Sequence, residues 1–100
     1  MIQITPTISI DESEVEETFI RSPGAGGQKV NKTASAAQLR YDARHSRALS
    51  NAVFLRLKTL AGRRMTSEGI VVIEASRFRT QDLNRRDALE RLVALIREAA

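Results

Sequence analysis

The stretch Ala37-Gln38-Leu39-Arg40-Tyr41-Asp42 decides the fold class, because apolar and polar residues alternate strictly along it. A period of two places each set of side chains on its own face of a strand, so these residues predict a half-buried β-strand. Upstream, residues 17–21 (ETFIR) are β-prone and predict a second strand. Downstream, residues 70–73 (IVVI) form a continuous apolar run after Gly69 and predict a strand in the centre of the sheet.

Two segments show a helical period instead. Apolar residues at steps of four, four and three predict one amphipathic helix: Leu49, Val53, Leu57 and Leu60. Gly62 is a natural stop for this helix. A second amphipathic helix is predicted near the C-terminus by Leu89, Leu92, Val93 and Ile96. Thr80 is a suitable N-cap for it.

The N-terminal residues predict a lead-in to this core. Isoleucines at positions 2, 4, 8 and 10, interrupted by Pro6, indicate an extended stretch with a break near the proline. Asp11 followed by Glu14 fits a capping box and one short helical turn.

The element order is therefore strand, strand, helix, strand, helix. This order predicts an α+β fold, in which a small three-stranded sheet carries both helices on one face. The length of 100 residues predicts a single domain spanning residues 1–100. Its expected core is formed by Leu39, Val53, Leu57, Val72, Leu89 and Leu92.

The composition excludes several kinds of site. With no cysteine, the chain has no disulfide, no thiol nucleophile and no cysteine-ligated metal. The lone histidine, His45, lies among Arg44, Ser46 and Arg47, which favours a solvent-exposed role. No apolar run approaches the ~18–20 residues of a membrane span, and the N-terminus lacks the features of a signal peptide. We therefore expect a cytoplasmic protein with no membrane partner, metal or cofactor.

Positive charge is concentrated in the middle of the chain. Residues 1–20 hold five acids and no base, residues 21–64 hold ten bases and one acid, and residues 65–100 hold six of each. The net charge is +4. Such an asymmetry is typical of a protein that binds a polyanion, in particular nucleic acid.

The stretch SPGAGGQKVNKTAS, residues 22–35, separates the first two predicted core strands. Hairpin loops usually need two to five residues, and a connection of about a dozen is usually functional. Amide and cationic donors follow the glycines, and the stretch holds no acid. It fits neither the Walker phosphate loop nor the dinucleotide fingerprint, and one histidine supports no Ser/His/Asp triad. Any catalytic base must therefore come from elsewhere.

Residues 22–32 (SPGAGGQKVNK) resemble the S-x-G-x-G-G-Q-x-V-N-K signature of the peptidyl-tRNA hydrolase domain of bacterial-type release factors. Residues 79–84 (RTQDLN) resemble the R-S-Q-x-x-N stretch of that family, with Thr80 in place of the usual serine. The resemblance covers nearly all of the chain. Because 100 residues leave no room for codon-reading domains, the chain is most similar to the short hydrolases that rescue stalled ribosomes. Those proteins have a basic tail after the last helix, whereas this sequence ends at Ala100 without one. Either the sequence is a truncated domain or it differs from the family, and we expect a truncated domain.

The resemblance implies ribosome-dependent hydrolysis of the peptidyl-tRNA ester, without stop-codon recognition. It implies that Gly26, Gly27 and Gln28 are catalytic, with the main-chain amide of Gln28 stabilising the oxyanion and its side chain shaping the place of the water. The implied partners are peptidyl-tRNA and the large-subunit rRNA at the peptidyl transferase centre, and the chain is expected to act as a monomer. The RNA phosphates would be contacted by five basic residues: Arg21, Lys29, Lys32, Arg40 and Arg44.

A non-catalytic ribosome- or RNA-binding module is the alternative, since it needs the same basic surface without ester chemistry. The four aromatic residues (Phe19, Tyr41, Phe54 and Phe78) are spaced as core residues more than as a base-stacking platform, which disfavours single-strand readout. A standalone esterase would lack both nucleophile and base.

Overall fold

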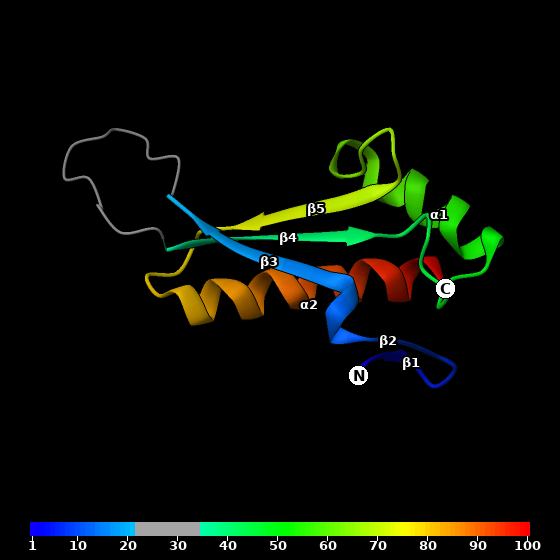
Figure 1. Cartoon of the computed structure of the whole chain (residues 1–100), viewed down its shortest axis with the longest axis horizontal. Helices are drawn as coiled ribbons and strands as arrows, with labels where there is room; N and C mark the ends of the chain where they lie inside the picture. The colour runs from blue at the N-terminus through cyan, green and yellow to red at the C-terminus, as the bar shows by residue number, and fades with distance from the viewer. Residues whose placement is uncertain (22–34) are drawn as a thin grey trace.

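The computed structural model describes residues 1–21 and 35–100 and confirms an α+β fold. Three antiparallel strands and two α-helices form its main body (Figure 1). The elements in chain order are β1 (Ile2–Thr5), β2 (Ile8–Ile10), the 3-10 turn η1 (Glu12–Glu14), β3 (Val15–Ile20), β4 (Ala36–Asp42), α1 (Asn51–Ala61), the 3-10 turn η2 (Gly62–Arg64), β5 (Ile70–Ala75) and α2 (Gln81–Ala99).

The sheet has the order β3-β4-β5, so β4 is its central strand. The β3–β4 ladder runs from Val15 opposite Tyr41 to Ile20 opposite Ala36. The strand predicted from the strictest alternation is therefore the one that pairs on both sides.

The prediction that residues 70–73 form a central strand is wrong, because β5 lies at an edge of the sheet. Val71 and Ile73 are buried, whereas Ile70 and Val72 are only half-buried on the open face. The run of four apolar residues is therefore explained by one strand face that is buried and another that is partly buried. For the same reason Val72, which we predicted to be a core residue, lies outside the core.

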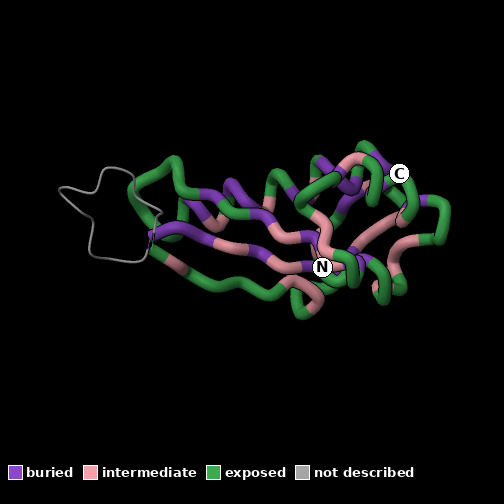
Figure 2. The backbone as a smooth tube through the Cα atoms, turned by 90° about the horizontal axis from the view of Figure 1, so that it is seen from above, coloured by how far each residue is buried: buried purple, intermediate pink, exposed green. Residues whose placement is uncertain are grey.

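The core lies between one face of the sheet and the helices. Leu39 and Tyr41 of β4 point into it, α2 packs against β4 and β5, and α1 packs against α2. In Figure 1, α2 runs along the sheet, and α1 lies at the end of the sheet opposite the one where β3 ends and β4 begins. Figure 2 shows buried and exposed stretches alternating along the chain, and β3 is exposed over most of its length. The predicted core residues Leu39, Val53, Leu57 and Leu92 are buried, and Leu89 is half-buried against them.

Local contacts account for both ends of α1 and for the start of α2. Ser50 caps α1 by accepting a hydrogen bond from the Val53 amide at 3.2 Å. Gly62 ends this helix with φ +56°, a conformation that favours glycine. The hydroxyl of Thr80 accepts from the Leu83 amide at 3.2 Å, which confirms the predicted cap of α2.

The N-terminal residues form an antiparallel β1–β2 hairpin, so the predicted break near Pro6 is a chain reversal. Ile4 and Ile10 are buried, and Arg97 of α2 donates to the Ile4 carbonyl at 2.9 Å. The Glu14 carboxylate accepts from the Asp11 amide at 3.0 Å, as a capping box requires.

Tyr41 links β4 to the segment that follows it and to η1. Its hydroxyl lies 2.6 Å from the Ser46 hydroxyl, which donates to the Glu14 carboxylate at 2.7 Å. Burial raises the pKa of Tyr41 to about 12. In the unfolded chain this phenol ionises near pH 10, so the unfolded state loses its proton first. The contribution of the protonated Tyr41 to the free energy of unfolding is therefore fully present below pH 10 and is lost as the pH rises towards 12.

Tyr41→Phe should lower the free energy of unfolding by about 1 kcal/mol at pH 8, because one buried hydrogen bond is lost. Between pH 10 and 12 the wild type should lose up to roughly 2–3 kcal/mol that the variant retains. Urea denaturation of both proteins at pH 8 and at several pH values between 10 and 12 measures these free energies. The absorbance of the chain's only tyrosine reports its ionisation directly. Equal alkaline losses in both proteins would contradict the assignment.

Candidate active site and RNA-binding surface

Strands β3 and β4 bring both ends of segment 22–34 to one end of the sheet. Ile20 and Ala36 form the last pair of the ladder, and Arg21 and Ser35 follow them directly. Figure 1 shows this end of the sheet opposite α1. The predicted catalytic residues Gly26, Gly27 and Gln28, and the predicted RNA contacts Lys29 and Lys32, lie outside the described residues. Their roles remain predictions.

Asn84 ties the returning end of that segment to the connection between β5 and α2. Its side chain is completely buried. The amide nitrogen donates to the Ser35 carbonyl at 2.7 Å and to the Phe78 carbonyl at 3.0 Å, and the amide oxygen accepts from the Phe78 amide at 2.9 Å. Both amide hydrogens are thereby used, which fixes the orientation of the side chain. Ser35 is consequently held in place at the base of the segment.

Asp87 reinforces the same connection from one turn further along α2. It is 4% exposed, and its two carboxylate oxygens each accept a 2.9 Å bond, one from Arg77 and one from Arg91. Two charge-assisted bonds compensate the desolvation of this buried carboxylate. This cluster was not predicted from the sequence, although the i,i+4 spacing of Asp87 and Arg91 on a helix indicates such a pair.

The stretch 79–84 thus has a local structural role. Thr80 starts α2, and Asn84 lies on the buried face of its first turns, directed at Ser35. The cap and the amide clamp together hold the β5–α2 connection beside the ends of β3 and β4. The hydroxyl of Thr80 and the amide of Asn84, four residues later, therefore both have structural partners here.

The described arginines predicted to bind RNA do not form one cluster. Arg21 is exposed at the end of the sheet that leads into segment 22–34. Arg40 projects from the open face of the sheet, with its guanidinium 3.8 Å from the carboxylate of Glu16. Arg44 lies beyond the far end of β4. A strand of this length spans roughly 20 Å, which separates Arg44 from the end of the sheet where Arg21 lies.

Arg44 has clear packing partners. Its guanidinium donates to the Glu68 carbonyl at 3.1 Å and lies 5.4 Å from the centroid of the Phe54 ring. A Cβ at Gly69, where φ is +87°, would come within 2.6 Å of the Arg44 Cβ. These contacts hold the turn before β5, and an RNA contact by Arg44 remains a prediction.

The expectation that the aromatic residues are core residues holds for only part of the set. Tyr41 is buried and Phe54 is half-buried, but Phe19 is 37% and Phe78 is 38% exposed. Phe19 lies on the edge strand β3, while α2 packs mainly on β4 and β5. The guanidinium of Arg77 lies 5.0 Å from the centroid of the Phe78 ring. Both exposed rings therefore belong to the end of the sheet where segment 22–34 begins and ends.

The family model that matches the chain is the RF-1 domain, and the match covers residues 2–100. The chain belongs to the RF-1 domain family. It is 45% identical over 96 residues to the peptidyl-tRNA hydrolase ArfB of Pseudomonas putida, a match that covers 96% of this chain and 69% of that protein. It is also 48% identical over 44 residues to peptide chain release factor 2 of Helicobacter pylori, covering 38% of this chain and 12% of that protein.

The lone histidine, His45, and its neighbour Ser46 have structural partners in this RF-1 domain. His45 is exposed, as predicted, and its ring nitrogen lies 2.9 Å from Asp42, a hydrogen bond that lowers the pKa of that carboxyl. The neighbouring Ser46 is bonded to Tyr41 and Glu14 instead. Within residues 1–21 and 35–100, no three His, Cys, Asp or Glu side chains could share a metal ion. No helix in these ranges has the length and apolar character needed to cross a membrane.

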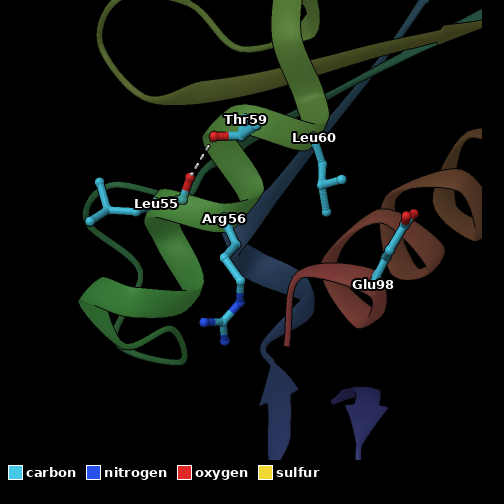
Figure 3. Close-up of a pocket in the computed structure, with 5 residues that line it drawn as sticks. All are labelled: Leu55, Arg56, Thr59, Leu60 and Glu98. Carbon is cyan, nitrogen blue, oxygen red and sulfur yellow. Dashed lines mark hydrogen bonds between the residues drawn. The ribbon is translucent and has the colours of Figure 1, made fainter.

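A cleft of about 480 Å³ lies between α1 and the end of α2 (Figure 3). Its lining includes Leu55, Leu60, Arg56 and Glu98. The hydroxyl of Thr59 is bonded to the Leu55 carbonyl at 3.4 Å, as the dashed line in Figure 3 marks. No nucleophile and base face one another here, so this cleft is not the candidate active site of the RF-1 domain.

Proposed function

We propose that this RF-1 domain hydrolyses the peptidyl-tRNA ester on the ribosome and releases nascent peptides from stalled ribosomes without reading a stop codon. One observation carries the proposal: the chain is 45% identical, along 96% of its length, to a protein named peptidyl-tRNA hydrolase ArfB. The shared length includes most of segment 22–34, since only a few residues of the chain fall outside the match. The anchoring of Ser35 by Asn84 gives that segment a rigid base.

In the proposed reaction, water attacks the ester carbonyl that joins the peptide to the terminal ribose of tRNA. The carbonyl oxygen becomes an oxyanion, and we assign its stabilisation to the main-chain amide of Gln28. Collapse of the intermediate breaks the bond to the ribose oxygen, which takes up a proton, and leaves a peptide carboxylate. Gly26 and Gly27 are assigned to bring the amide close to crowded RNA, because they carry no side chain. The side chain of Gln28 is assigned to place the water.

The chain supplies only part of this site. Near the end of the sheet that carries segment 22–34, the carboxylate of Asp87 is paired with Arg77 and Arg91 and that of Glu74 accepts a hydrogen bond from Gln38. The lone histidine lies beyond the opposite end of β4. We therefore assign the remaining groups to the peptidyl transferase centre of the large ribosomal subunit. The proposed partners are that rRNA and peptidyl-tRNA, and the proposed unit is a single-domain cytoplasmic monomer without cofactor.

Peptide release should be independent of the codon in the ribosomal A site and should be most efficient when that site holds no mRNA. The reason is that the RF-1 domain match takes up residues 2–100, so within this stretch no separate region is assigned to codon reading. Release from ribosomes carrying labelled peptidyl-tRNA, with an empty A site, a sense codon or a stop codon, measures this. Release confined to stop codons would contradict the proposal. Saturable ribosome binding without any release would support the alternative, a non-catalytic binding module.

A further inference from the structure

The two edges of the sheet differ in charge. The first twenty residues, which include η1 and the edge strand β3, hold five acids and no base: Asp11, Glu12, Glu14, Glu16 and Glu17. Of these, Glu16 is paired with Arg40 at 3.8 Å and Glu17 with Arg85 at 3.6 Å. The opposite edge, formed by β5, is flanked by the arginines of η2 and by Arg91 of α2. A polyanion that approaches the molecule is therefore attracted to the β5 edge and repelled by the β3 edge.

A groove of about 510 Å³ follows the β5 edge. Val72 and Ile73 form part of its lining, together with Arg63 and Arg64 from η2 and Arg91 from α2. The first part of the edge is covered, since Met65 bridges to Val71. The groove thus brings three guanidinium groups from two separate elements to one strand edge.

These arginines differ in what holds them. Arg91 is fixed by the Asp87 carboxylate at 2.9 Å and by the Glu74 carbonyl at 3.2 Å. Arg64 makes only long bonds of 3.4 Å to the last carbonyls of α1. Arg63 is exposed and makes no hydrogen bond or ion pair with any residue of 1–21 or 35–100. The one acid in the lining, Glu74, accepts a hydrogen bond from Gln38 at 2.9 Å.

We propose that this groove binds the phosphate backbone of ribosomal RNA and thereby orients the β5 edge towards the RNA and the acidic β3 edge away from it. The proposal rests on the proposed function, which places the chain on the ribosome. Arginine guanidinium groups present a planar fork of donors that fits phosphate oxygens. Contacts of this kind fix the orientation of a protein without reading sequence.

Protection of a bare strand edge is the competing explanation for charged residues here. It accounts for Arg91, which occupies the Glu74 carbonyl on that edge. It does not account for Arg63, which bonds to no described part of the edge. Arg63 and Arg64 are therefore the residues that separate the two explanations.

The test compares wild type, Arg63→Ala, the double variant Arg63→Ala/Arg64→Ala, and the control Arg86→Ala. Arg86 is equally exposed to solvent on α2 and is paired with Asp82 at 3.2 Å. It lies roughly opposite the buried Ala88 on the helix, away from the groove. Ribosome binding is measured over a range of salt concentrations, single-turnover release is measured at saturating ribosomes, and thermal melts confirm that each variant is folded.

We expect the double variant to bind ribosomes about tenfold or more weakly. The slope of log affinity against log salt should become shallower by about 1 for each contact removed. Release at saturation should be unchanged, and Arg86→Ala should match wild type in every measurement. If the double variant binds with wild-type affinity and salt slope while wild type releases peptide normally, the groove proposal fails and the proposed function stands. If wild type neither binds nor releases, the proposed function fails and the groove loses its partner with it.

Discussion

Gly27→Ala is expected to reduce single-turnover peptide release by ~10²–10³-fold, the usual cost of losing one oxyanion donor. An added Cβ restricts the backbone and takes up space where we place the closest approach to RNA, so it should misdirect the Gln28 amide. Gly26→Ala is expected to act in the same direction. Gln28→Ala keeps the amide and removes only the side chain, so it should cost less than either glycine variant.

Release from ribosomes at saturating protein concentration ranks these variants by their chemical step alone. Thermal melts serve as the control, because the core of the described residues is formed by residues such as Leu39, Leu57 and Leu92, none of which is changed in these variants. All three variants should melt cooperatively near the wild-type temperature. The assignment of the backbone donor is wrong if Gln28→Ala is the most damaging change while the glycine variants remain active.

Asn84→Leu is expected to lower the free energy of unfolding by about 3 kcal/mol or more. The substitution leaves the Ser35 carbonyl and both main-chain groups of Phe78 without their partner, and each buried polar group left unsatisfied costs about 1–3 kcal/mol. The matched control is Asn51→Leu, because Asn51 is exposed at the first residue of α1. That change should alter stability by less than about 0.5 kcal/mol.

Asn84→Leu should also lower the release rate at saturating ribosomes under conditions where the melt shows a folded domain. The reason is that Ser35, the first described residue after segment 22–34, loses its tether. Urea denaturation together with single-turnover release separates the two effects. A variant that is destabilised yet releases peptide at the wild-type rate would show that Asn84 supports the fold and not the reaction.

Most of the fold could be predicted because the periodicity of β4, α1 and α2 matches their burial. The alternation of residues 37–42 predicted a half-buried strand, which the structure places at the centre of the sheet. Ser50, Gly62 and Thr80 mark helix ends through local bonds and one positive φ. The place of β5 could not be predicted this way. A run of apolar residues indicates that both faces of a strand are at least partly buried, but it does not indicate the position of the strand in the sheet. Val72 is half-buried although β5 lies at the edge.

The candidate site shows a different limit. The motifs indicated the residues of segment 22–34 and the stretch 79–84, but the bond from Asn84 to Ser35 joins residues 49 positions apart and depends on the packing of α2. The basic residues of the middle segment were expected to act together. The fold instead separates Arg21 from Arg44 and gathers Arg63 and Arg91, of which the first comes from the strongly basic stretch 21–64 and the second from the electrically balanced stretch 65–100. Net charge along a chain cannot report which side chains a sheet edge brings together.

The most direct test of the central claim compares two substrates for the purified chain: peptidyl-tRNA free in solution, and the same peptidyl-tRNA in the P site of ribosomes with an empty A site. The carboxylates of Asp87 and Glu74, near the end of the sheet that carries segment 22–34, already have partners within the chain, and we assign the remaining catalytic groups to the ribosome. We therefore expect release from ribosomes at saturating concentration and hydrolysis of the free substrate close to the uncatalysed background. Gly27→Ala serves as the inactive control in both arms. Rapid hydrolysis of free peptidyl-tRNA by the wild-type chain, at a rate that ribosomes do not increase, would contradict the account.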